Sequence, residues 1–357
     1  MVFIHHQNQI NIYHLPVFLF DIFKELHVGV TVFFVLSGFL ITYRYYPSVI
    51  ISKQWIGKYM VNRIARIYPM FFLLTGCAFL FQFLYLNQQP DSIKIFSNLF
   101  LVKGYFNNLK FTGIPQSWSL TVEETFYFSA PFIFLFQKKT HKSFLLIFII
   151  LILGFLIVKL NQPASAYEFM SNNYFMLTYT FFGRCFEFFI GIYLALIMIN
   201  KKKFNTKKKQ TMIFTFIGIL SFCVILILMS FVASQLNVKF SIYTYPGIFL
   251  NNIILPFAIA STIYGLINEE SIIKRILQWP IFQILGKSSY IFYLVHLGFI
   301  STMIEICFPI KNVYLNVFVL FILLNLISIV LYKIAEEPLR VLIKKAFLPR
   351  TRLMRTK

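Results

Sequence analysis

Two adjacent histidines, His5 and His6, follow four apolar residues at the start of the chain. Imidazole exchanges a proton near neutral pH, so this pair could supply a general base. An apolar run this short cannot cross a bilayer, which needs about 20 residues. We therefore expect the run to be the far end of a first membrane helix whose beginning precedes Met1. The alternatives are a solvated pair at the membrane interface and a zinc site with His14; no helical spacing supplies a third zinc ligand, so we expect no metal.

Two acidic residues, Glu123 and Glu124, lie inside the apolar stretch that follows Trp118. They come about one turn after the expected N-terminus of a helix, where the helix dipole favours negative charge. Glu123 and Tyr127 are four residues apart and share a helix face with Ser119. A carboxylate beside an imidazole fixes the tautomer of that imidazole, so Glu123 is a candidate partner of the histidines. A capping acid at the interface is the alternative, and it accounts for one of the two acids.

Arg63 and Arg66 are three residues apart, so they share one helix face at an expected membrane boundary. Each guanidinium presents a planar fork of donors that suits a phosphate group. The pair could therefore hold a phosphorylated substrate. Anchoring to lipid headgroups is an alternative that the sequence supports equally well.

Polar side chains interrupt two later apolar runs, and ionisable groups in membrane segments are functional candidates because they are costly there. Arg184 and Glu187 are three residues apart, which predicts an ion pair, for which a structural role is favoured. Tyr293 and His296 share one helix face. A lone histidine on an apolar face is more often a hydrogen-bonded core residue than a catalyst.

Ser37 and Gly38 are small residues in the middle of an apolar run. Small residues let another helix approach the backbone closely within a membrane. Close approach of an acyl chain and tight helix packing are both consistent with this pair.

The composition indicates that membrane helices position these groups. The chain has 357 residues, of which 59% are hydrophobic and 13% are charged, against about 25% charged in soluble domains. The net charge of +21 arises from short clusters of Lys and Arg between apolar runs, which excludes a continuous nucleic-acid-binding face. The four cysteines show no metal or disulfide spacing, so we expect them to be small buried hydrophobic residues.

Nine apolar runs are long enough to cross a bilayer. They lie near residues 28–46, 67–86, 119–137, 143–160, 174–199, 211–233, 244–267, 288–308 and 313–334. With the truncated first run they predict an all-α polytopic transmembrane helix bundle of about ten helices. A further apolar run near 95–106 is expected to be a short interfacial segment.

The basic residues divide unequally between the two sets of connecting loops. One side, which includes the C-terminus, carries 25 Lys and Arg, the other side carries 7, and Arg184 lies within a run. Because cytoplasmic loops are enriched in Lys and Arg, we expect both termini in the cytoplasm and a multi-pass protein of the inner (plasma) membrane. We expect one membrane domain over residues 1–345 and a basic cytoplasmic tail over 346–357.

Five sequence segments, in this order, make the chain similar to the acyltransferase 3 family of integral membrane O-acyltransferases. They cover nearly the whole chain, and together they are very specific. They are His6 with Gly29–Ile41, Arg63–Pro69, Trp118–Tyr127, Ser289–His296 and Glu336–Pro338.

The resemblance implies ten helices, an acyl-CoA donor that arrives from the cytoplasm as co-substrate, and an acceptor hydroxyl on a sugar, as in polysaccharide biosynthesis. It implies that His6 is the essential histidine, that Arg63 and Arg66 contact the CoA phosphates, and that Glu123 is the motif acid. The expected reaction is O-acetylation of a cell-surface or lipid-linked carbohydrate, with His6 as general base or transient acyl carrier and no bound cofactor. A lipid bilayer and the two substrates are the expected partners, without nucleic acid.

The family pattern also has an arginine with ten residues between it and the histidine, and that position precedes Met1 here. At 1.5 Å per helical residue this group would lie about 16 Å from His6 toward the cytoplasm. An in-frame apolar stretch upstream of Met1 would supply it; a damaged copy is the alternative.

The rival interpretation is a transporter or flippase for a lipid-linked glycan. Such proteins also place polar groups in mid-membrane, but they commonly consist of two similar halves with broken helices. We find no matching pair of interrupted runs in this sequence, which favours the acyltransferase.

Overall fold

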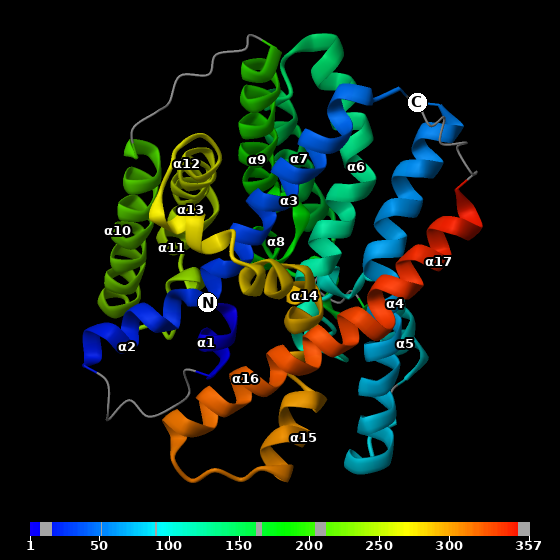
Figure 1. Cartoon of the computed structure of the whole chain (residues 1–357), viewed down its shortest axis with the longest axis vertical. Helices are drawn as coiled ribbons and strands as arrows, with labels where there is room; N and C mark the ends of the chain where they lie inside the picture. Colours follow the sequence, from blue (N-terminus) through cyan, green and yellow to red (C-terminus); the bar gives the residue numbers. More distant parts are fainter. Residues whose placement is uncertain (8–15, 51, 90, 162–165, 204–211, 349–357) are drawn as a thin grey trace.

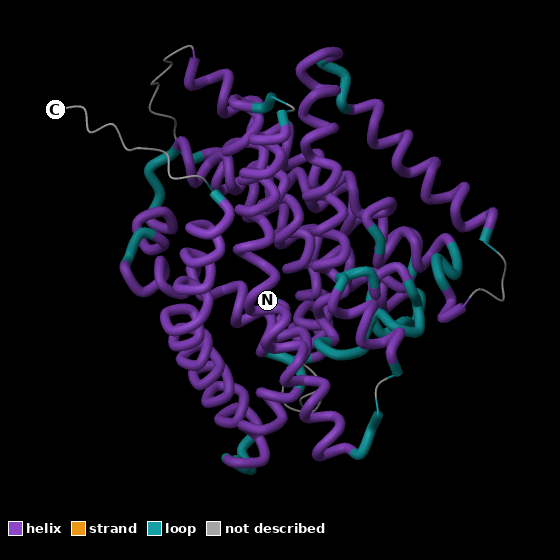
Figure 2. The backbone as a smooth tube through the Cα atoms, turned by 90° about the vertical axis from the view of Figure 1, so that its right-hand side faces the viewer, coloured by secondary structure: helices purple, strands orange, loops and turns teal. Residues whose placement is uncertain are grey.

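The computed structural model describes residues 1–7, 16–50, 52–89, 91–161, 166–203 and 212–348. Within these ranges the chain is helical and contains no strand, apart from one isolated bridge between Phe106 and Phe169. Figure 2 shows helices joined by loops throughout the described chain. The predicted all-α class is confirmed.

Each of the nine long apolar runs is helical over most of its described length. Four of them form continuous helices, namely α3 (Gly29–Tyr45), α4 (Lys53–Leu86), α6 (Trp118–Thr140) and α7 (Phe144–Leu160). Four later runs correspond to α8 (Asn173–Tyr179) with α9 (Phe181–Lys203), α10 (Ile213–Gln235), α11 (Tyr245–Phe249) with α12 (Leu255–Asn268), and α16 (Val313–Leu331). Shorter helices are α1 (Val2–Gln7), α2 (Val17–Lys24), α5 (Ser92–Leu99), α13 (Ile272–Leu277) and α17 (Glu337–Phe347).

The number of spans is lower than predicted when judged by length and hydropathy. Six helical stretches of the described chain are long and apolar enough to cross a membrane, or seven if one bent pair forms a single span. Neither α6 nor α7 is among them: α7 has only 17 residues, and α6 carries Glu123 and Glu124 near its start. The chain is thus a multi-pass helical bundle, with six or seven rather than about ten spans by this criterion.

The run near 288–308 was expected to be one continuous span, and this expectation was wrong. It divides into α14 (Pro280–Val295) and α15 (Phe299–Cys307), which meet at an angle of 87°. Gly298 between them has φ +112°, a backbone conformation that side chains other than hydrogen rarely allow. The bend leaves His296 at the C-terminal end of α14.

Small residues bring α3 and α9 into close contact. A Cβ atom on Gly38 would lie 2.2 Å from the Phe188 carbonyl oxygen, and one on Gly191 would lie 2.1 Å from the Val35 carbonyl oxygen. The backbones of these two helices can therefore touch only because both positions are glycine. Gly38 acts here in helix packing.

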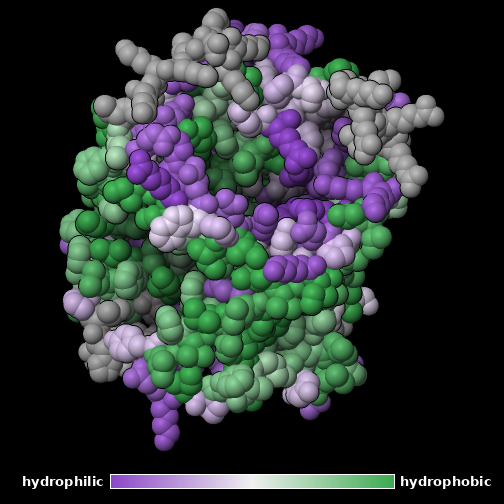
Figure 3. Space-filling model, in the orientation of Figure 1, coloured by the Kyte–Doolittle hydropathy of each residue, from purple (hydrophilic) through white to green (hydrophobic). Residues whose placement is uncertain are grey.

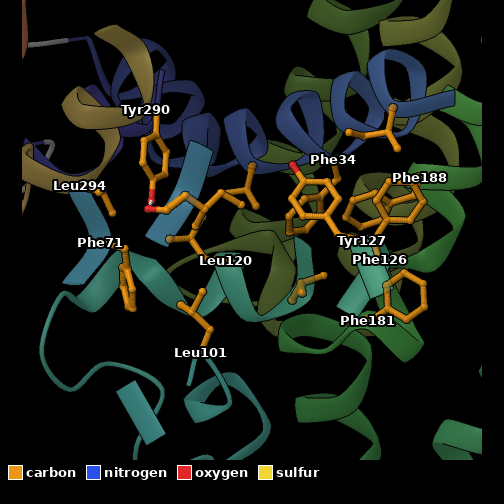
Figure 4. Close-up of a cluster of buried hydrophobic side chains, with 14 of the residues drawn as sticks. Phe34, Phe71, Leu101, Leu120, Phe126, Tyr127, Phe181, Phe188, Tyr290 and Leu294 are labelled. Carbon is orange, nitrogen blue, oxygen red and sulfur yellow. Dashed lines mark hydrogen bonds between the residues drawn. The ribbon is translucent and has the colours of Figure 1, made fainter. Parts of the chain in front are cut away.

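Aromatic side chains fill the space between α3, α6, α9 and α14. The Phe188 ring stacks on those of Phe34 and Phe126, with ring centroids 4.8 Å and 4.5 Å apart. Figure 4 shows these rings together with Tyr127 and Tyr290, whose hydroxyl groups are the polar atoms of the cluster. The Tyr290 hydroxyl donates to the Ile67 carbonyl at 2.8 Å, which ties α14 to α4.

The outer surface is apolar over much of its area. Figure 3 shows hydrophobic residues covering the lower part of one face and hydrophilic residues gathered over its upper part. In α7 the side chains are almost all apolar, yet only Ile147 and Gly154 are buried. A helix that is apolar on all sides and remains exposed suits a lipid environment. In Figure 1, α1 lies near the centre of the molecule, beside α14.

Candidate functional site

His6 and His296 form the first contact of the site. The Nδ1 atom of His6 lies 3.0 Å from the Nε2 atom of His296, although the residues are 290 positions apart. The two rings stack with centroids 5.1 Å apart. The bend after α14 places His296 at the end of that helix, where its side chain can meet α1.

The hydrogen bonds of this pair determine its neutral tautomers. The Tyr293 carbonyl oxygen lies 2.7 Å from the Nδ1 atom of His296. A carbonyl can only accept, so His296 carries its proton on Nδ1 and accepts through Nε2. His6 must then donate from Nδ1, which leaves its Nε2 atom with a free lone pair. A nitrogen in this state can accept a proton or attack a carbonyl.

His5 and His27 lie beside this pair. The His5 ring is 5.2 Å from the His6 ring and 5.5 Å from the His27 ring, measured between centroids. The His5 Nδ1 atom donates to the Lys24 carbonyl at 2.6 Å. Within the described residues no group of three His, Cys, Asp or Glu side chains has metal-binding geometry. His14 lies outside the described residues.

These histidines line a cavity of about 210 Å³, which we call the histidine cavity. Its wall includes His5, His6 and His27 together with Gln116, Trp118 and Arg184. Several further aromatic side chains complete it, among them Tyr179, Phe240 and Tyr243. The cavity therefore combines nitrogen bases with flat apolar surfaces.

Arg184 and Glu187 form the predicted ion pair at the edge of this cavity. The Arg184 Nε atom lies 2.8 Å from a Glu187 carboxylate oxygen, and both side chains are almost completely buried. Arg184 also donates to the Thr31 hydroxyl at 3.0 Å, and its guanidinium lies over the Phe34 ring. Pairing and hydrogen bonding offset the cost of burying this charge. The network joins α9 to α3.

A second cavity of about 400 Å³ adjoins the first, and we call it the arginine cavity. Its polar lining comprises Ser37, Arg63, Arg66, Glu123, Tyr127 and Ser289. The two cavities share Val2, Val30 and Tyr293 as lining residues. These three side chains separate the two cavities, which therefore adjoin at this junction.

The structure brings Glu123 together with Ser37 and Tyr127, and not with His6. A Glu123 carboxylate oxygen accepts from the Ser37 hydroxyl at 2.5 Å and from the Tyr127 hydroxyl. Glu123 lies in the wall of the arginine cavity, whereas His6 lies in that of the histidine cavity. The position expected for Glu123 beside His6 is occupied by His296. Glu123 therefore ties α6 to α3 at the arginine cavity.

The two predicted arginines line the same cavity but have different partners. Arg66 forms an ion pair with Glu336, which is almost fully buried. Arg63 packs against the rings of Tyr45 and Tyr127. Its Nε atom is buried and has no hydrogen-bond partner within the described residues. Arg63 thus lines the cavity and retains a buried donor that no described residue pairs.

The remaining predicted site residues form hydrogen bonds and ring contacts of their own. The hydroxyl groups of Ser119 and Tyr293 are 2.5 Å apart, and Tyr293 also donates to the Gln116 carbonyl at 2.8 Å. Glu124 accepts from the Tyr68 hydroxyl at 3.2 Å. Trp118 packs edge-on against Tyr179 in the wall of the histidine cavity.

Three residues of the site were not assigned a role from the sequence. His27 and Gln116 line the histidine cavity, and Glu336 pairs with Arg66. His27 lies two residues before the Gly29 segment. The sequence could have identified it as a site candidate, because it is an ionisable residue at the start of an apolar run. Nothing in the spacing of Gln116 or Glu336 indicates which distant residue each one meets.

The fold and these cavities define a class: a multi-pass helical membrane protein whose bundle encloses adjoining histidine and arginine cavities. The family model for the acyltransferase 3 family, described as an acyltransferase domain, matches residues 1–333, so the chain belongs to that family. The resemblance seen in the sequence is confirmed.

Two curated relatives from Staphylococcus aureus carry names of this kind. "O-acetyltransferase OatA" (strain NCTC 8325 / PS 47) is 26% identical over 343 residues, which cover 90% of this chain and 53% of the relative. "Putative O-acetyltransferase SACOL0978" (strain COL) is 27% identical over 297 residues, which cover 77% of this chain and 46% of the relative. The chain thus spans about half the length of these relatives. No solved structure matches the chain.

Proposed function

We propose that this chain transfers an acyl group, most simply acetyl, from acyl-CoA to a hydroxyl group of a cell-surface or lipid-linked carbohydrate. The single observation that carries the proposal is the hydrogen-bond chain from the Tyr293 carbonyl through His296 to His6. It leaves the His6 Nε2 atom unprotonated beside the junction of two cavities. Membership of the acyltransferase family and the names of the relatives support the reaction class.

The donor occupies the arginine cavity in this proposal. Arg63 and Arg66 bind phosphate groups of acyl-CoA, for which guanidinium groups are well suited. Arg66 must share its charge between Glu336 and the donor, whereas Arg63 has a free buried donor atom. In this proposal the arginine cavity faces the cytoplasm, where acyl-CoA is found, because cytoplasmic loops are enriched in Lys and Arg and the loops on the Arg63 side are the basic ones.

The acceptor occupies the histidine cavity, on the other side of the junction. Its hydroxyl proton passes to the His6 Nε2 atom while the hydroxyl oxygen bonds to the thioester carbonyl carbon. The C–S bond then breaks, and the proton passes from His6 to the departing CoA sulfur. His296 stabilises the cationic form of His6 only through its lone pair, because it has no negative charge. General base catalysis of this kind contributes about 10²–10⁴-fold to a rate.

The alternative step within the same reaction is direct attack of the His6 Nε2 atom on the thioester. This forms an acyl-imidazole and releases CoA, and the acceptor hydroxyl then takes the acyl group from the imidazole. Labelled acyl group that stays on the protein without acceptor, and disappears when acceptor is added, would identify this route.

The proposal is tested by following acetyl-CoA labelled in the acetyl group, with the purified chain reconstituted in lipid vesicles and a glycan acceptor. We expect label to enter the glycan with equal release of free CoA, and His6→Ala to abolish both. Equal turnover by the His6→Ala protein would overturn the assignment of His6. Movement of unmodified glycan across the vesicle membrane without labelling would instead indicate a flippase.

The donor site has its own test. Arg63→Lys keeps the charge but loses the planar fork, so we expect a higher KM for acetyl-CoA and an unchanged KM for the acceptor. Arg44→Lys is the matched control, since Arg44 is exposed at the end of α3 and does not line the cavity. An equal effect of both substitutions would contradict the assignment of Arg63.

A further inference from the structure

The histidine cavity contains polar atoms that the hydrogen bonds of the protein leave unused. Both ring nitrogens of His27 are buried and have no hydrogen-bond partner within the described residues. The same is true of the Gln116 side-chain oxygen, Oε1. Both residues line this cavity. Buried polar groups nearly always have partners, so unpaired ones on residues that line a cavity point to a missing ligand.

Two protein groups near His27 already accept hydrogen bonds from other residues. The Lys24 carbonyl accepts from His5 at 2.6 Å. The Glu25 carboxylate accepts from the backbone N–H and the hydroxyl of Ser241 at 2.8 Å and 2.6 Å. Its nearer oxygen is 3.7 Å from the His27 Nδ1 atom, which is too long for a hydrogen bond. Within the described residues, the His27 nitrogens are therefore left without a hydrogen-bond partner.

Unlike the His27 ring, the Gln116 side chain is held in place by hydrogen bonds from its amide nitrogen. Its Nε2 atom donates to three backbone carbonyls at the bend after α14, those of Tyr293, Leu294 and Leu297, at 2.8, 2.9 and 3.2 Å. The side chain is 3% exposed and cannot turn without losing these bonds. The orientation of Oε1 is thus fixed before any ligand enters, which makes it a preorganised acceptor.

Flat aromatic side chains surround these two residues. Trp118 and Tyr179 pack edge to face with centroids 4.9 Å apart, and the Phe240 ring lies 6.3 Å from that of His27. Aromatic faces carry partial negative charge and attract the weakly positive C–H groups of a ligand. A ring with an apolar C–H face and hydroxyl groups at its edge matches both the wall and the free polar atoms. A sugar ring has this chemistry.

We propose that His27 and Gln116 are the acceptor-binding residues of the histidine cavity and select a sugar ring with at least two hydroxyl groups besides the reacting one. One hydroxyl donates to the Gln116 Oε1 atom and another pairs with a His27 nitrogen, while the C–H face lies on the aromatic wall. The third hydroxyl is thereby presented to the His6 Nε2 atom. This inference rests on the proposed transfer to a carbohydrate, and it adds the residues that position the acceptor.

The first test compares KM and kcat for the two substrates. His27→Phe keeps a flat ring and removes both nitrogens, so we expect the acceptor KM to rise about tenfold for one lost hydrogen bond. The KM for acetyl-CoA should stay unchanged, and His27→Gln should recover part of the loss. His141→Phe is the control, because His141 is an exposed histidine outside this cavity. An unchanged acceptor KM in His27→Phe would overturn the inference while leaving the proposed function intact.

The second test does not depend on turnover. Trp118 lines the cavity, and the chain has only two other tryptophans, Trp55 and Trp279, which can be replaced by Phe. Titration of that protein with methyl glycosides of glucose, galactose, mannose and N-acetylglucosamine should give a saturable change in Trp118 fluorescence. We expect His27→Phe to weaken the binding about tenfold. No saturable change with any of the four glycosides would overturn the acceptor assignment, and binding without acetyl transfer would instead contradict the proposed function.

Discussion

At the scale of single residues, the site depends on which atom of each imidazole carries the proton. The Tyr293 carbonyl sets the tautomer of His296, and His296 in turn sets that of His6. A backbone carbonyl cannot change its role with pH, so it provides a fixed starting point for the chain. Catalytic triads use a carboxylate for the same orienting purpose. Here a neutral second histidine occupies that position, whereas Glu123 lies in the wall of the other cavity.

This arrangement predicts a specific loss on substitution of His296. His296→Phe preserves the ring stacking on His6 but removes the acceptor for its Nδ1 proton. We expect kcat for acetyl transfer to fall by about 10²-fold or more, with little change in the KM of either substrate. His296→Gln, whose side-chain oxygen can accept that proton, should restore part of kcat. Loss of substrate affinity instead of kcat would show that His296 has a packing role.

At the scale of elements, α3 and α9 pack closely because each has a glycine at their contact. Gly38 and Gly191 allow α3 and α9 to touch, and the Arg184 network then links the same helices. Since α3 contributes Ser37 to the arginine cavity and Thr31 to the network, its position affects both cavities. The spacing between these helices is therefore part of the site.

Gly38→Ala tests this contact. The added Cβ would lie 2.2 Å from the Phe188 carbonyl oxygen, so the helices must separate. We expect a loss of about 1–3 kcal/mol, typical of an overpacked interface, seen as a lower Tm in detergent micelles. Gly57→Ala is the matched control, because no atom lies within 4 Å of the added group. That substitution should leave Tm unchanged or raise it slightly, since Ala favours a helix over Gly. Equal Tm values for the two variants would contradict the packing role of Gly38.

The loop before α6 contains a fully buried lysine, Lys103. Its Nζ atom donates to the carbonyls of Thr112 and Ile114 at 2.5 Å and 2.7 Å. Burial lowers the pKa of Lys103 well below its usual value. A neutral amine has two N–H groups, and two carbonyls are available to accept them. This lysine therefore ties down the segment that leads to Gln116.

The lowered pKa of Lys103 gives a dependence of stability on pH. Between the lowered folded-state pKa and the unfolded value of about 10.4, the unfolded chain binds one more proton than the folded chain. The free energy of unfolding must then rise with pH in this window. We expect Tm in detergent to increase from pH 7 toward pH 9.5, and Lys103→Met to show a smaller increase. Identical pH slopes for the two proteins would show that Lys103 is charged when folded.

At the scale of the whole molecule, the asymmetry of the basic residues and the placement of the cavities agree. The arginine cavity is lined by α3, α4, α6 and α14, and the loops on the Arg63 side of the bundle are the basic ones. The histidine cavity includes Phe111 and Ile242, which lie in loops with few basic residues. A donor and an acceptor could thus approach the junction from opposite sides of the membrane.

Membrane orientation is tested with single cysteines in a chain whose four native cysteines are replaced by Ser. Lys139→Cys lies in the last turn of α6, next to a basic loop, and Lys239→Cys lies in a loop of the other set; both positions are exposed. We expect a membrane-impermeant thiol reagent to label position 239 in intact cells and position 139 only after permeabilisation. The reverse pattern would place the arginine cavity outside the cytoplasm and exclude acyl-CoA as its ligand.

The sequence by itself determined the class of the protein and most of its elements. The long apolar runs became helical because a bilayer requires long apolar segments with internally satisfied backbones, and this requirement is visible in the composition. The ion pair of Arg184 and Glu187 was also predictable, because helical spacing of three residues decides it locally.

Only the tertiary structure decided which of these groups meet. His6 and His296 are separated by 290 positions, and Arg66 and Glu336 by 270. No helical or strand periodicity relates residues so far apart in the sequence. The 87° bend at Gly298 brings His296 to α1, while Glu123 remains with Ser37 and Tyr127. Spacing along a helix fixes a side chain's face but not the neighbour that the face packs against, so the partner of the histidine could be known only from the folded bundle.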